Sequence, residues 1–258
     1  MVVQEFSLAG KAALVTGAGN TLGKAISLAL AEAGADVALA SRMPSDGERQ
    51  EIEAAAAAIK QLGRNSVALP LVDVTQAEEV ERMVARAVAE LGKVDILVNN
   101  AEVPFAKPIL ETSVEEWNKV IDVNLTSVFL CCKAAGRRML EQGKGKIINI
   151  ASAFADRGVA NCTAYCASKG GVVQLTKALA LEWALKNVYV NAIGQIWFDG
   201  APGLEDENIR GALQRYLPMR RFGQPDELGG LVVYLASSAS DYITGETIFI
   251  SGGIMGHI

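Results

Sequence analysis

The chain has 258 residues and a mass of 27.2 kDa, which suits one large α/β domain better than two ordinary ones. Half of the residues are hydrophobic, so the chain can bury a full core, and an intrinsically disordered protein is excluded. The net charge of −5 argues against a nucleic-acid-binding protein, because such proteins carry a basic surface.

Short apolar runs alternate with longer amphipathic runs along the whole chain. We expect strands at 11–16, 37–40, 67–72, 96–99, 146–150, 188–192 and 247–250. The helices are expected at about 22–33, 46–62, 76–91, 114–142 with a break near Asp122, 165–185 and from Pro225 onward, with a short helix inside 198–222. Strands that are apolar throughout indicate a parallel sheet covered on both faces. Right-handed crossovers then predict a doubly wound parallel sheet, the Rossmann fold, as a single domain over residues 1–258.

Several kinds of site are excluded by what the sequence lacks. Its one histidine is His257, so Ser-His-Asp and Cys-His catalysis have almost no imidazole to use. The four cysteines form no CxxC pair, and we expect small buried thiols and no metal site. No apolar stretch approaches the roughly 18 residues needed to span a bilayer, and the first residues do not resemble a signal peptide. We therefore expect a soluble cytoplasmic protein without a membrane partner.

A glycine-rich turn, Thr16-Gly17-Ala18-Gly19-Asn20-Thr21-Leu22-Gly23, joins the first strand to the first helix. Gly17 would let the chain turn sharply, and Gly23 would let the helix pack closely on the sheet. The N-terminus of that helix would offer N–H groups and a positive dipole end to a pyrophosphate. The alternative is a structural turn that binds no ligand.

The end of the second strand distinguishes the two nicotinamide cofactors. An acidic residue there usually holds the ribose 2′-hydroxyl, but this sequence has Ser41 followed by Arg42, and Asp36 begins the strand at its other end. A neutral serine beside an arginine suits a 2′-phosphate, which favours NADP(H) over NAD(H). Alternatively, Arg42 is a solvated loop residue.

Tyr165 and Lys169 stand four residues apart in a predicted helix and so share one face. A free tyrosine has a pKa near ~10, and a neighbouring ammonium would stabilise its phenolate. Ser152 follows the fifth predicted strand, where its hydroxyl could hold a carbonyl oxygen while Tyr165 transfers the proton. Asn124 could organise a water that leads to Lys169.

Together with Asn99-Asn100-Ala101, these residues resemble the short-chain dehydrogenase/reductase family over nearly the whole chain, and Ser152 and Tyr165 have the family's spacing of 13 residues. The resemblance implies a catalytic tetrad of Asn124, Ser152, Tyr165 and Lys169, with Lys169 also binding the nicotinamide ribose. It places Asp73 beside the adenine. The implied cofactor contacts are Gly17, Asn20, Thr21, Leu22, Gly23, Ser41, Arg42, Asp73, Val74, Asn100, Ala101, Tyr165, Lys169 and Ile196.

Four positions depart from the family's pattern. Thr21 replaces the middle glycine of the turn, and its hydroxyl at a helix N-cap could donate to phosphate. Glu102 replaces the glycine after Asn-Asn-Ala, where its charge could repel acidic substrates or point to solvent. Gln195-Ile196 replaces Pro-Gly, and Gly200 stands where a threonine often holds the carboxamide. The scaffold is thus typical of the family, and the residues expected to hold the cofactor are not.

Residues 194–222 form the expected substrate loop, in which Trp197, Phe198, Tyr216 and Met219 could line an apolar pocket with Arg220 and Arg221 as a basic rim or as solvated side chains. The stretches 182–184 and 191–194 look most like the gluconate 5-dehydrogenase branch, with the 3-oxoacyl-carrier-protein reductase branch close behind. The resemblance implies an NADP(H)-dependent carbonyl/alcohol oxidoreductase with a small-molecule substrate, assembled as a homotetramer or a dimer through helices 114–142 and 165–185. The alternative is a non-catalytic nucleotide-binding or redox-sensing protein on the same fold.

Overall fold

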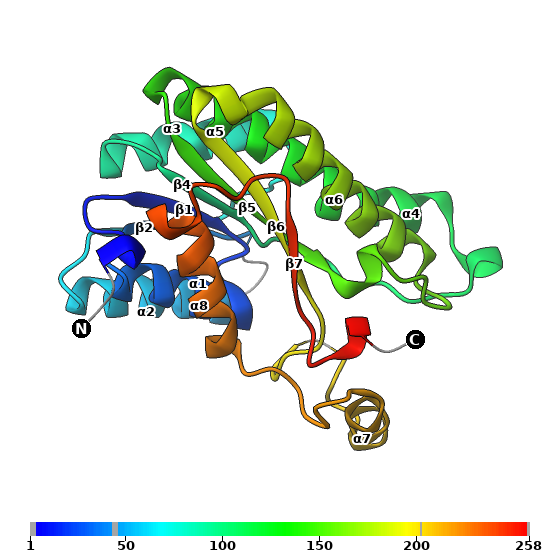
Figure 1. The fold of residues 1–258 in the computed structure, drawn as a ribbon. Helices are drawn as coiled ribbons and strands as arrows, with labels where there is room; N and C mark the ends of the chain where they lie inside the picture. Colours follow the sequence, from blue (N-terminus) through cyan, green and yellow to red (C-terminus); the bar gives the residue numbers. More distant parts are fainter. Residues whose placement is uncertain (1–3, 43–45, 202, 257–258) are drawn as a thin grey trace.

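A seven-stranded parallel sheet forms the centre of the computed structural model, which describes residues 4–42, 46–201 and 203–256 (Figure 1). The strand order is β3-β2-β1-β4-β5-β6-β7, so the direction of winding reverses between β1 and β4. The strands are β1 (Ala12–Thr16), β2 (Asp36–Ala40), β3 (Ser66–Leu69), β4 (Ile96–Asn99), β5 (Gly145–Ser152), β6 (Val188–Gln195) and β7 (Thr247–Ile250). This confirms the predicted doubly wound α/β fold. His257 lies outside the described residues.

Helices cover both faces of the sheet (Figure 1). On one face lie α1 (Thr21–Glu32), α2 (Asp46–Gln61) and α8 (Pro225–Ala236); on the other lie α3 (Ala77–Leu91), α5 (Ser127–Gln142) and α6 (Thr163–Trp183). Successive β1 side chains alternate between them: Ala13 and Val15 enter the first core and Leu14 the second. Because both faces are covered, most of the strand residues are apolar.

The carboxyl ends of three strands differ from the prediction, whereas the first residues of the strands differ by at most one. β3 stops at Leu69 instead of 72, because Leu71 adopts a left-handed backbone with φ of 60° that cannot continue a strand. β5 and β6 instead run further, since their pairing continues to Ser152 opposite Gln195. Ser152 is thus the last residue of β5, not a loop residue beyond it. Pro225 does open α8 at its first turn, as predicted.

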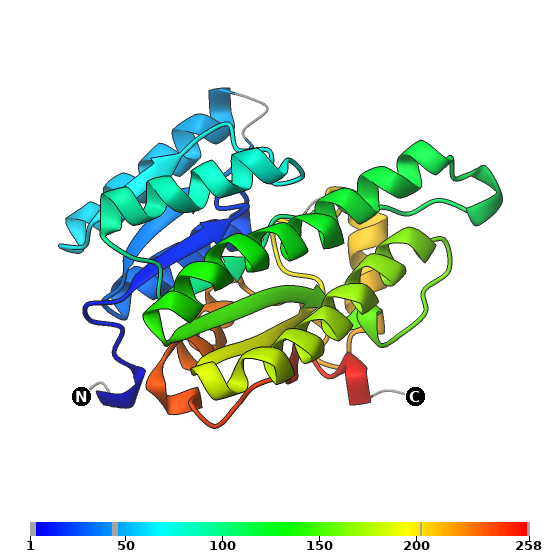
Figure 2. The same cartoon turned by 90° about the horizontal axis from the view of Figure 1, so that it is seen from above.

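The predicted break near Asp122 is a π-helical turn over Asp122–Thr126, between α4 (Val114–Ile121) and α5. The two helices follow one another beside α6, so the break leaves their direction nearly unchanged (Figure 2). Single π-turns inside helices are frequent at functional sites. Here the turn carries Asn124, whose side chain is fully buried.

A buried polar network, which the sequence analysis missed, connects β4 and β5 to α5 and α6. Asn149 is completely buried; its Oδ1 accepts from Nδ2 of Asn99 at 2.8 Å, and its Nδ2 donates to Oγ1 of Thr176 at 2.9 Å. The Sγ of Cys132 lies 3.3 Å from Nδ2 of Asn99. These bonds tie the centre of the sheet to the helices just below the candidate site.

We expect Asn149→Ala to destabilise the protein, because Asn99 and Thr176 would each lose a partner in the interior, at about 1–3 kcal/mol per unsatisfied group. The measurement is urea unfolding followed by circular dichroism. Asn118→Ala is the matched control, since Asn118 is exposed on α4. Equal unfolding midpoints for the two variants would contradict the assigned role of the network.

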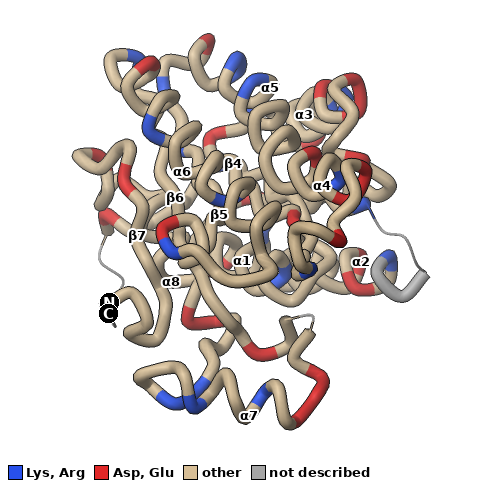
Figure 3. The backbone as a smooth tube through the Cα atoms, turned by 90° about the vertical axis from the view of Figure 1, so that its right-hand side faces the viewer, with Lys and Arg blue, Asp and Glu red and all other residues tan. Residues whose placement is uncertain are grey.

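Residues 194–222, the expected substrate loop, pack mainly on a small core of their own beyond the carboxyl ends of β6 and β7. That core contains Ile196, Leu204, Leu217, Phe222 and Ile254. It holds α7 (Glu207–Tyr216), the predicted short helix, which projects from the body of the molecule (Figure 3). Phe198 of the same segment packs in the first main core, so the segment is anchored to the body of the molecule as well.

Within the part of the chain that the structure describes, the four cysteines are free thiols. Burial raises the pKa of Cys131 above its usual range and that of Cys132 to about 12, which makes both thiols unreactive. Among the described residues, no cluster of three or more His, Cys, Asp or Glu side chains could hold a metal ion. None of the described helices is long and apolar enough to cross a membrane.

Candidate active site

The glycine-rich turn has the tight geometry that its sequence predicts. Gly17 adopts a φ of 63°, and a Cβ there would lie 2.8 Å from the Cα of Ala101. A Cβ on Gly23 would lie 2.2 Å from the carbonyl oxygen of Gly17. Only glycine fits at either position, so strand, turn and helix are pressed together as a dinucleotide pyrophosphate requires.

Asn100 braces this turn from the end of β4. Its Nδ2 donates to the carbonyl oxygen of Gly17 at 3.0 Å and lies 3.3 Å from both the carbonyl oxygen of Thr16 and Oδ1 of Asn20. The backbone N–H groups of Asn100 and Ala101 bond to the Thr16 hydroxyl at 3.1 and 3.3 Å. The Asn-Asn-Ala segment thus serves to fix the phosphate turn.

The expected N-cap role of Thr21 is wrong. The N-cap of α1 is Asn20, whose Oδ1 accepts from the N–H of Gly23 at 2.7 Å, because an amide oxygen one residue earlier reaches the first turn. The hydroxyl of Thr21 instead donates to the carbonyl oxygen of Gly200 at 3.4 Å. Gly200 has a φ of 78°, and a Cβ there would lie 3.2 Å from the Thr21 side chain. The two departures are thus neighbours, and Thr21 joins the phosphate turn to the substrate loop.

Ser41 and Arg42 follow β2 at the carboxyl edge of the sheet, where the prediction places the adenosine ribose. The Arg42 side chain is 66% exposed, and its Nη2 lies 3.8 Å from Oδ2 of Asp73. Burial opposes ionisation of Asp73, but hydrogen bonds from Thr75 and the Arg42 charge together lower the pKa of this carboxyl. Val74 follows, nearly buried. As predicted, Asp36 begins β2 at its other end. There its carboxylate accepts hydrogen bonds from the backbone and side chain of Asn65.

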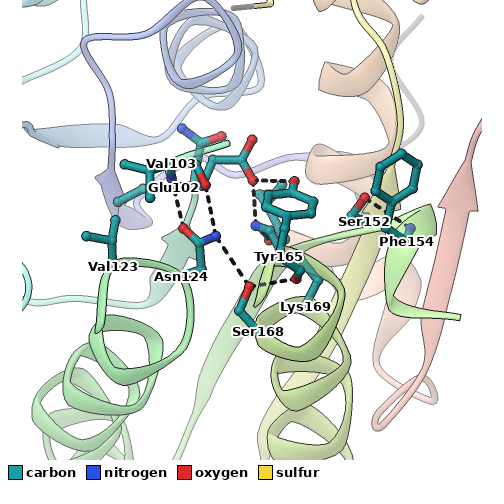
Figure 4. A network of polar contacts seen from close by, with 12 residues as sticks. Glu102, Val103, Val123, Asn124, Ser152, Phe154, Tyr165, Ser168 and Lys169 are labelled. Atoms are coloured by element: carbon teal, nitrogen blue, oxygen red, sulfur yellow. Dashed lines mark hydrogen bonds and ion pairs between the residues drawn. The ribbon is translucent and has the colours of Figure 1, made fainter. Parts of the chain in front are cut away.

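Ser152, Tyr165 and Lys169 meet at the carboxyl ends of β4 and β5 (Figure 4). Tyr165 and Lys169 are buried on one face of α6, and Nζ of Lys169 lies 5.6 Å from the centroid of the Tyr165 ring. That Nζ also donates to the carbonyl oxygen of Ile150 at 3.0 Å. The Ser152 hydroxyl, at the end of β5, faces the phenol and accepts from the N–H of Phe154.

The Glu102 side chain points into this group and not to solvent. Its contacts there go beyond the repulsion of acidic substrates that the sequence also suggested. Its Oε2 lies 2.5 Å from Nζ of Lys169 and accepts a hydrogen bond from the Tyr165 hydroxyl at 3.1 Å (Figure 4). Burial raises the pKa of Tyr165 well above its usual range, and the Glu102 charge and hydrogen bond raise it further. The carboxylate therefore opposes the phenolate that Lys169 would stabilise.

Asn124 contacts the segment that carries Glu102. Its Oδ1 accepts from the N–H of Val103 at 2.8 Å, while its Nδ2 donates to the Val103 carbonyl oxygen at 3.0 Å and to the Ser168 hydroxyl at 3.3 Å. The side chain thus links the π-turn, the chain after β4 and α6. That Asn124 organises a water molecule leading to Lys169 stays a prediction.

A row of aromatic side chains leads outward from Tyr165. Phe154 packs edge-on against Tyr165 at 6.0 Å and against Trp197 at 6.1 Å, and Trp197 contacts Tyr216 at 6.4 Å between ring centroids. Arg157 donates to the Tyr216 hydroxyl at 3.3 Å and to the carbonyl oxygen of Ile254 at 2.7 Å. Sequence analysis missed Phe154 and Arg157, although their places two and five residues after Ser152 put them near the site.

Some side chains of residues 194–222 line a cavity, and others lie on the protein surface. Trp197, Phe198, Met219 and Arg221 line a cavity of about 90 Å³ beside β6 and β7. Arg221 is held at that rim by Glu227, with Nη1 and Nη2 at 2.6 and 2.7 Å from its two carboxylate oxygens, so its charge is compensated. Phe198 is buried, and Arg220 is exposed.

The family model described as enoyl-(acyl carrier protein) reductase matches residues 17–255 of this chain. The chain belongs to the short-chain dehydrogenase/reductase family. It is accordingly an enzyme, an oxidoreductase, and the resemblance drawn from its motifs is confirmed.

Among its relatives, the 2-dehydro-3-deoxy-D-gluconate 5-dehydrogenase of Bacillus subtilis is 40% identical, with 96% of each chain covered. The 3-oxoacyl-[acyl-carrier-protein] reductase of Staphylococcus aureus is 38% identical over 95% of this chain and 98% of its own length. Both branches suggested by the sequence are therefore represented.

Solved structures agree in fold and differ in cofactor. A gluconate 5-dehydrogenase from Burkholderia cenocepacia, in complex with NADP and tartrate, has a TM-score of 0.90 and 32% identity, with 98% of both chains covered. An NAD+-bound xylitol dehydrogenase has a TM-score of 0.87 and 32% identity, covering 95% of this chain and 99% of its own.

Proposed function

We propose that this chain is an NADP(H)-dependent oxidoreductase that interconverts a carbonyl and an alcohol on a small substrate, such as a keto sugar acid or a 3-oxoacyl thioester. The observation that carries the proposal is the meeting of Ser152, Tyr165 and Lys169 beside the carboxyl ends of β4 and β5. In open α/β sheets, ligands bind in the crevice outside the strand carboxyl ends, near the switch point.

The side chains suit the proposed roles. In the direction of reduction, the Tyr165 hydroxyl donates its proton to the carbonyl oxygen, which the Ser152 hydroxyl holds by a hydrogen bond. Lys169 stabilises the phenolate that remains and, by the family resemblance, binds the nicotinamide ribose. When bound, NADPH supplies the hydride to the carbonyl carbon.

The cofactor cradle supports a nicotinamide dinucleotide. Gly17, Asn20, Leu22 and Gly23 form the tight turn and the helix N-terminus that suit a pyrophosphate, beside Asn100 and Ala101. Ile196 lies buried at the end of β6, on the proposed nicotinamide side. The 2′-phosphate preference is proposed from Ser41 and Arg42, since the relatives of solved structure include one with bound NADP and one with bound NAD+.

The substrate class is proposed from the relatives and the loop. The substrate types suggested by the relatives' names, a keto sugar acid and a 3-oxoacyl thioester, both carry a ketone that Tyr165 and Ser152 could serve. Residues 194–222 are assigned as the loop that selects between them. The guanidinium of Arg157 next to the Tyr216 hydroxyl offers a cation to an acidic group held away from the ketone.

A substrate panel tests this proposal. NADPH oxidation is followed with keto sugar acids, acetoacetyl thioesters and cyclic ketones, after NADPH fluorescence has shown binding. Turnover of one class supports the proposal and names the substrate type. Binding without turnover of any class would favour the alternative of a nucleotide-binding protein that does not catalyse.

We expect the protein to assemble as a tetramer, or at least a dimer. Large apolar side chains are exposed on the helices predicted to pair, with Trp117 and Phe129 on α4 and α5, Leu181 on α6 and Leu185 just after it. Leu181 and Leu185 are 84% and 96% exposed, which an isolated chain would leave in water. Light scattering at micromolar concentration measures the mass, and a monomer would refute the expectation.

The cytoplasmic location and the single-domain assignment stay predictions.

A further inference from the structure

We propose that Glu102 is a further member of the catalytic group, which holds the Lys169 ammonium and the Tyr165 hydroxyl together and keeps the phenol in its protonated, proton-donating form. The role of Tyr165 as proton donor rests on the proposed function. The contacts of Glu102 do not depend on that function, and its effect on the phenol can be measured without substrate.

The geometry places one carboxylate oxygen between both partners. Oε2 of Glu102 is 2.5 Å from Nζ of Lys169 and 3.1 Å from the Tyr165 hydroxyl oxygen (Figure 4). The Lys169 side chain is 2% exposed, and Tyr165 is 8% exposed, so bulk water screens these contacts little. Glu102 itself is 22% exposed and comes from the chain after β4, on the opposite side of the group from α6.

The carboxylate changes the electrostatic balance around the phenol. An ammonium next to Tyr165 alone would favour the phenolate, but here that charge is paired with Glu102. A phenolate would also place its own negative charge next to that of the carboxylate, with no proton left for the hydrogen bond between them. The hydrogen bond therefore forms only with the neutral phenol.

The other groups near Tyr165 do not reverse this balance. Lys169 lies on α6, as Tyr165 does, and its charge is paired with Glu102. Cys162, a buried thiol at the start of α6, raises the pKa of Tyr165 slightly, in the same direction as Glu102. The Ser152 hydroxyl, from β5, acts in the opposite direction. Burial and Glu102 prevail, and they raise the pKa of Tyr165 well above its usual range.

The consequence differs for the two directions of the reaction. Carbonyl reduction needs the phenol of Tyr165 as a proton donor. Glu102 keeps that phenol protonated throughout the neutral range. Alcohol oxidation needs a proton acceptor, so its rate is expected to increase as the pH rises toward the raised pKa of Tyr165. Removing the Glu102 charge should lower that pKa and move the rise to lower pH.

The test is a spectrophotometric titration of tyrosinate absorbance in the protein without cofactor or substrate. Tyr165 is isolated as the difference between wild type and Tyr165→Phe, and again as the difference between Glu102→Gln and the double variant with Tyr165→Phe. Glu102→Gly repeats the measurement with the residue typical of the family. Glu111→Gln is the control, because Glu111 is an exposed carboxylate outside the site.

We expect Glu102→Gln and Glu102→Gly to lower the titration midpoint of Tyr165 by about one pH unit or more, and Glu111→Gln to leave it unchanged. Circular dichroism at each pH limits the comparison to folded protein, so a Tyr165 that ionises before unfolding only in the Glu102 variants also supports the proposal. Equal midpoints in wild type and both variants, or no ionisation before unfolding in any of them, would overturn it. If the midpoint moves and the substrate panel shows no turnover, only the proposed function fails.

Discussion

Replacing Tyr165 by phenylalanine is expected to lower kcat at least ~100-fold while leaving cofactor affinity nearly unchanged, as for the loss of a general acid. The substitution removes only the hydroxyl that bonds to Glu102 and faces Ser152. The ring remains, so its edge-on packing against Phe154 is retained. The loss should therefore appear in the chemical step and not in folding.

The measurement is steady-state turnover with the substrate that the panel identifies, together with NADPH titration by fluorescence. Tyr242→Phe is the matched control, because the Tyr242 side chain is fully exposed and lies outside the site. Near-normal turnover by Tyr165→Phe would remove Tyr165 from the proposed role, and with it the assigned tetrad. A loss of NADPH binding as large as the loss of kcat would point instead to a cofactor contact.

Features set by local backbone geometry could be predicted from the sequence. Gly17 and Gly23 stand at positions where a Cβ would strike backbone atoms, so their spacing alone defines the turn. The strands could be predicted because both faces of the sheet are covered, so most of their side chains are apolar. The ends of β5 and β6 could not be predicted, because the pairing of one strand with the other extends both to Ser152 and Gln195.

Features that depend on distant segments could not be predicted. Whether Glu102 faces solvent or the site is decided by where α6 places Lys169, 67 residues later in the chain (169 − 102). Likewise, the contact of Thr21 with Gly200 joins the first helix to the substrate loop. Each residue that departs from the family's pattern can be identified in the sequence, but its contacts are determined by the fold.

Arg42→Ala is expected to abolish a preference for NADPH over NADH. Carboxylates in NAD-specific enzymes accept bonds from the ribose hydroxyls and would repel a 2′-phosphate, whereas Ser41 is neutral. A charge-assisted bond from Arg42 to the phosphate contributes about 1.5–3 kcal/mol. With about 1.4 kcal/mol for each factor of ten, wild type should favour NADPH by roughly 10- to 100-fold.

The surroundings of Arg42 decide where in that range the preference falls. Its side chain is 66% exposed and free to turn toward a phosphate, but its Nη2 already lies 3.8 Å from the Asp73 carboxylate. The lowered pKa of Asp73 keeps that carboxylate ionised at neutral pH, so it competes with the phosphate for the same guanidinium. Asp73 therefore favours the lower part of the range.

Titration of NADPH and NADH against wild type, Arg42→Ala and Arg82→Ala tests the assignment. Arg82 is a matched control, because its side chain is 68% exposed and is paired with Glu78 on α3, away from the cofactor cradle. The expected pattern is a loss of NADPH affinity in Arg42→Ala alone, with NADH affinity unchanged, since NADH carries no group for the guanidinium to bind. Equal affinities for both cofactors in wild type, or an undiminished NADPH preference in Arg42→Ala, would overturn the NADP(H) assignment. Neither result would affect the fold or the catalytic group, because Arg42 follows β2 and its side chain pairs with Asp73, not with Tyr165 or Lys169.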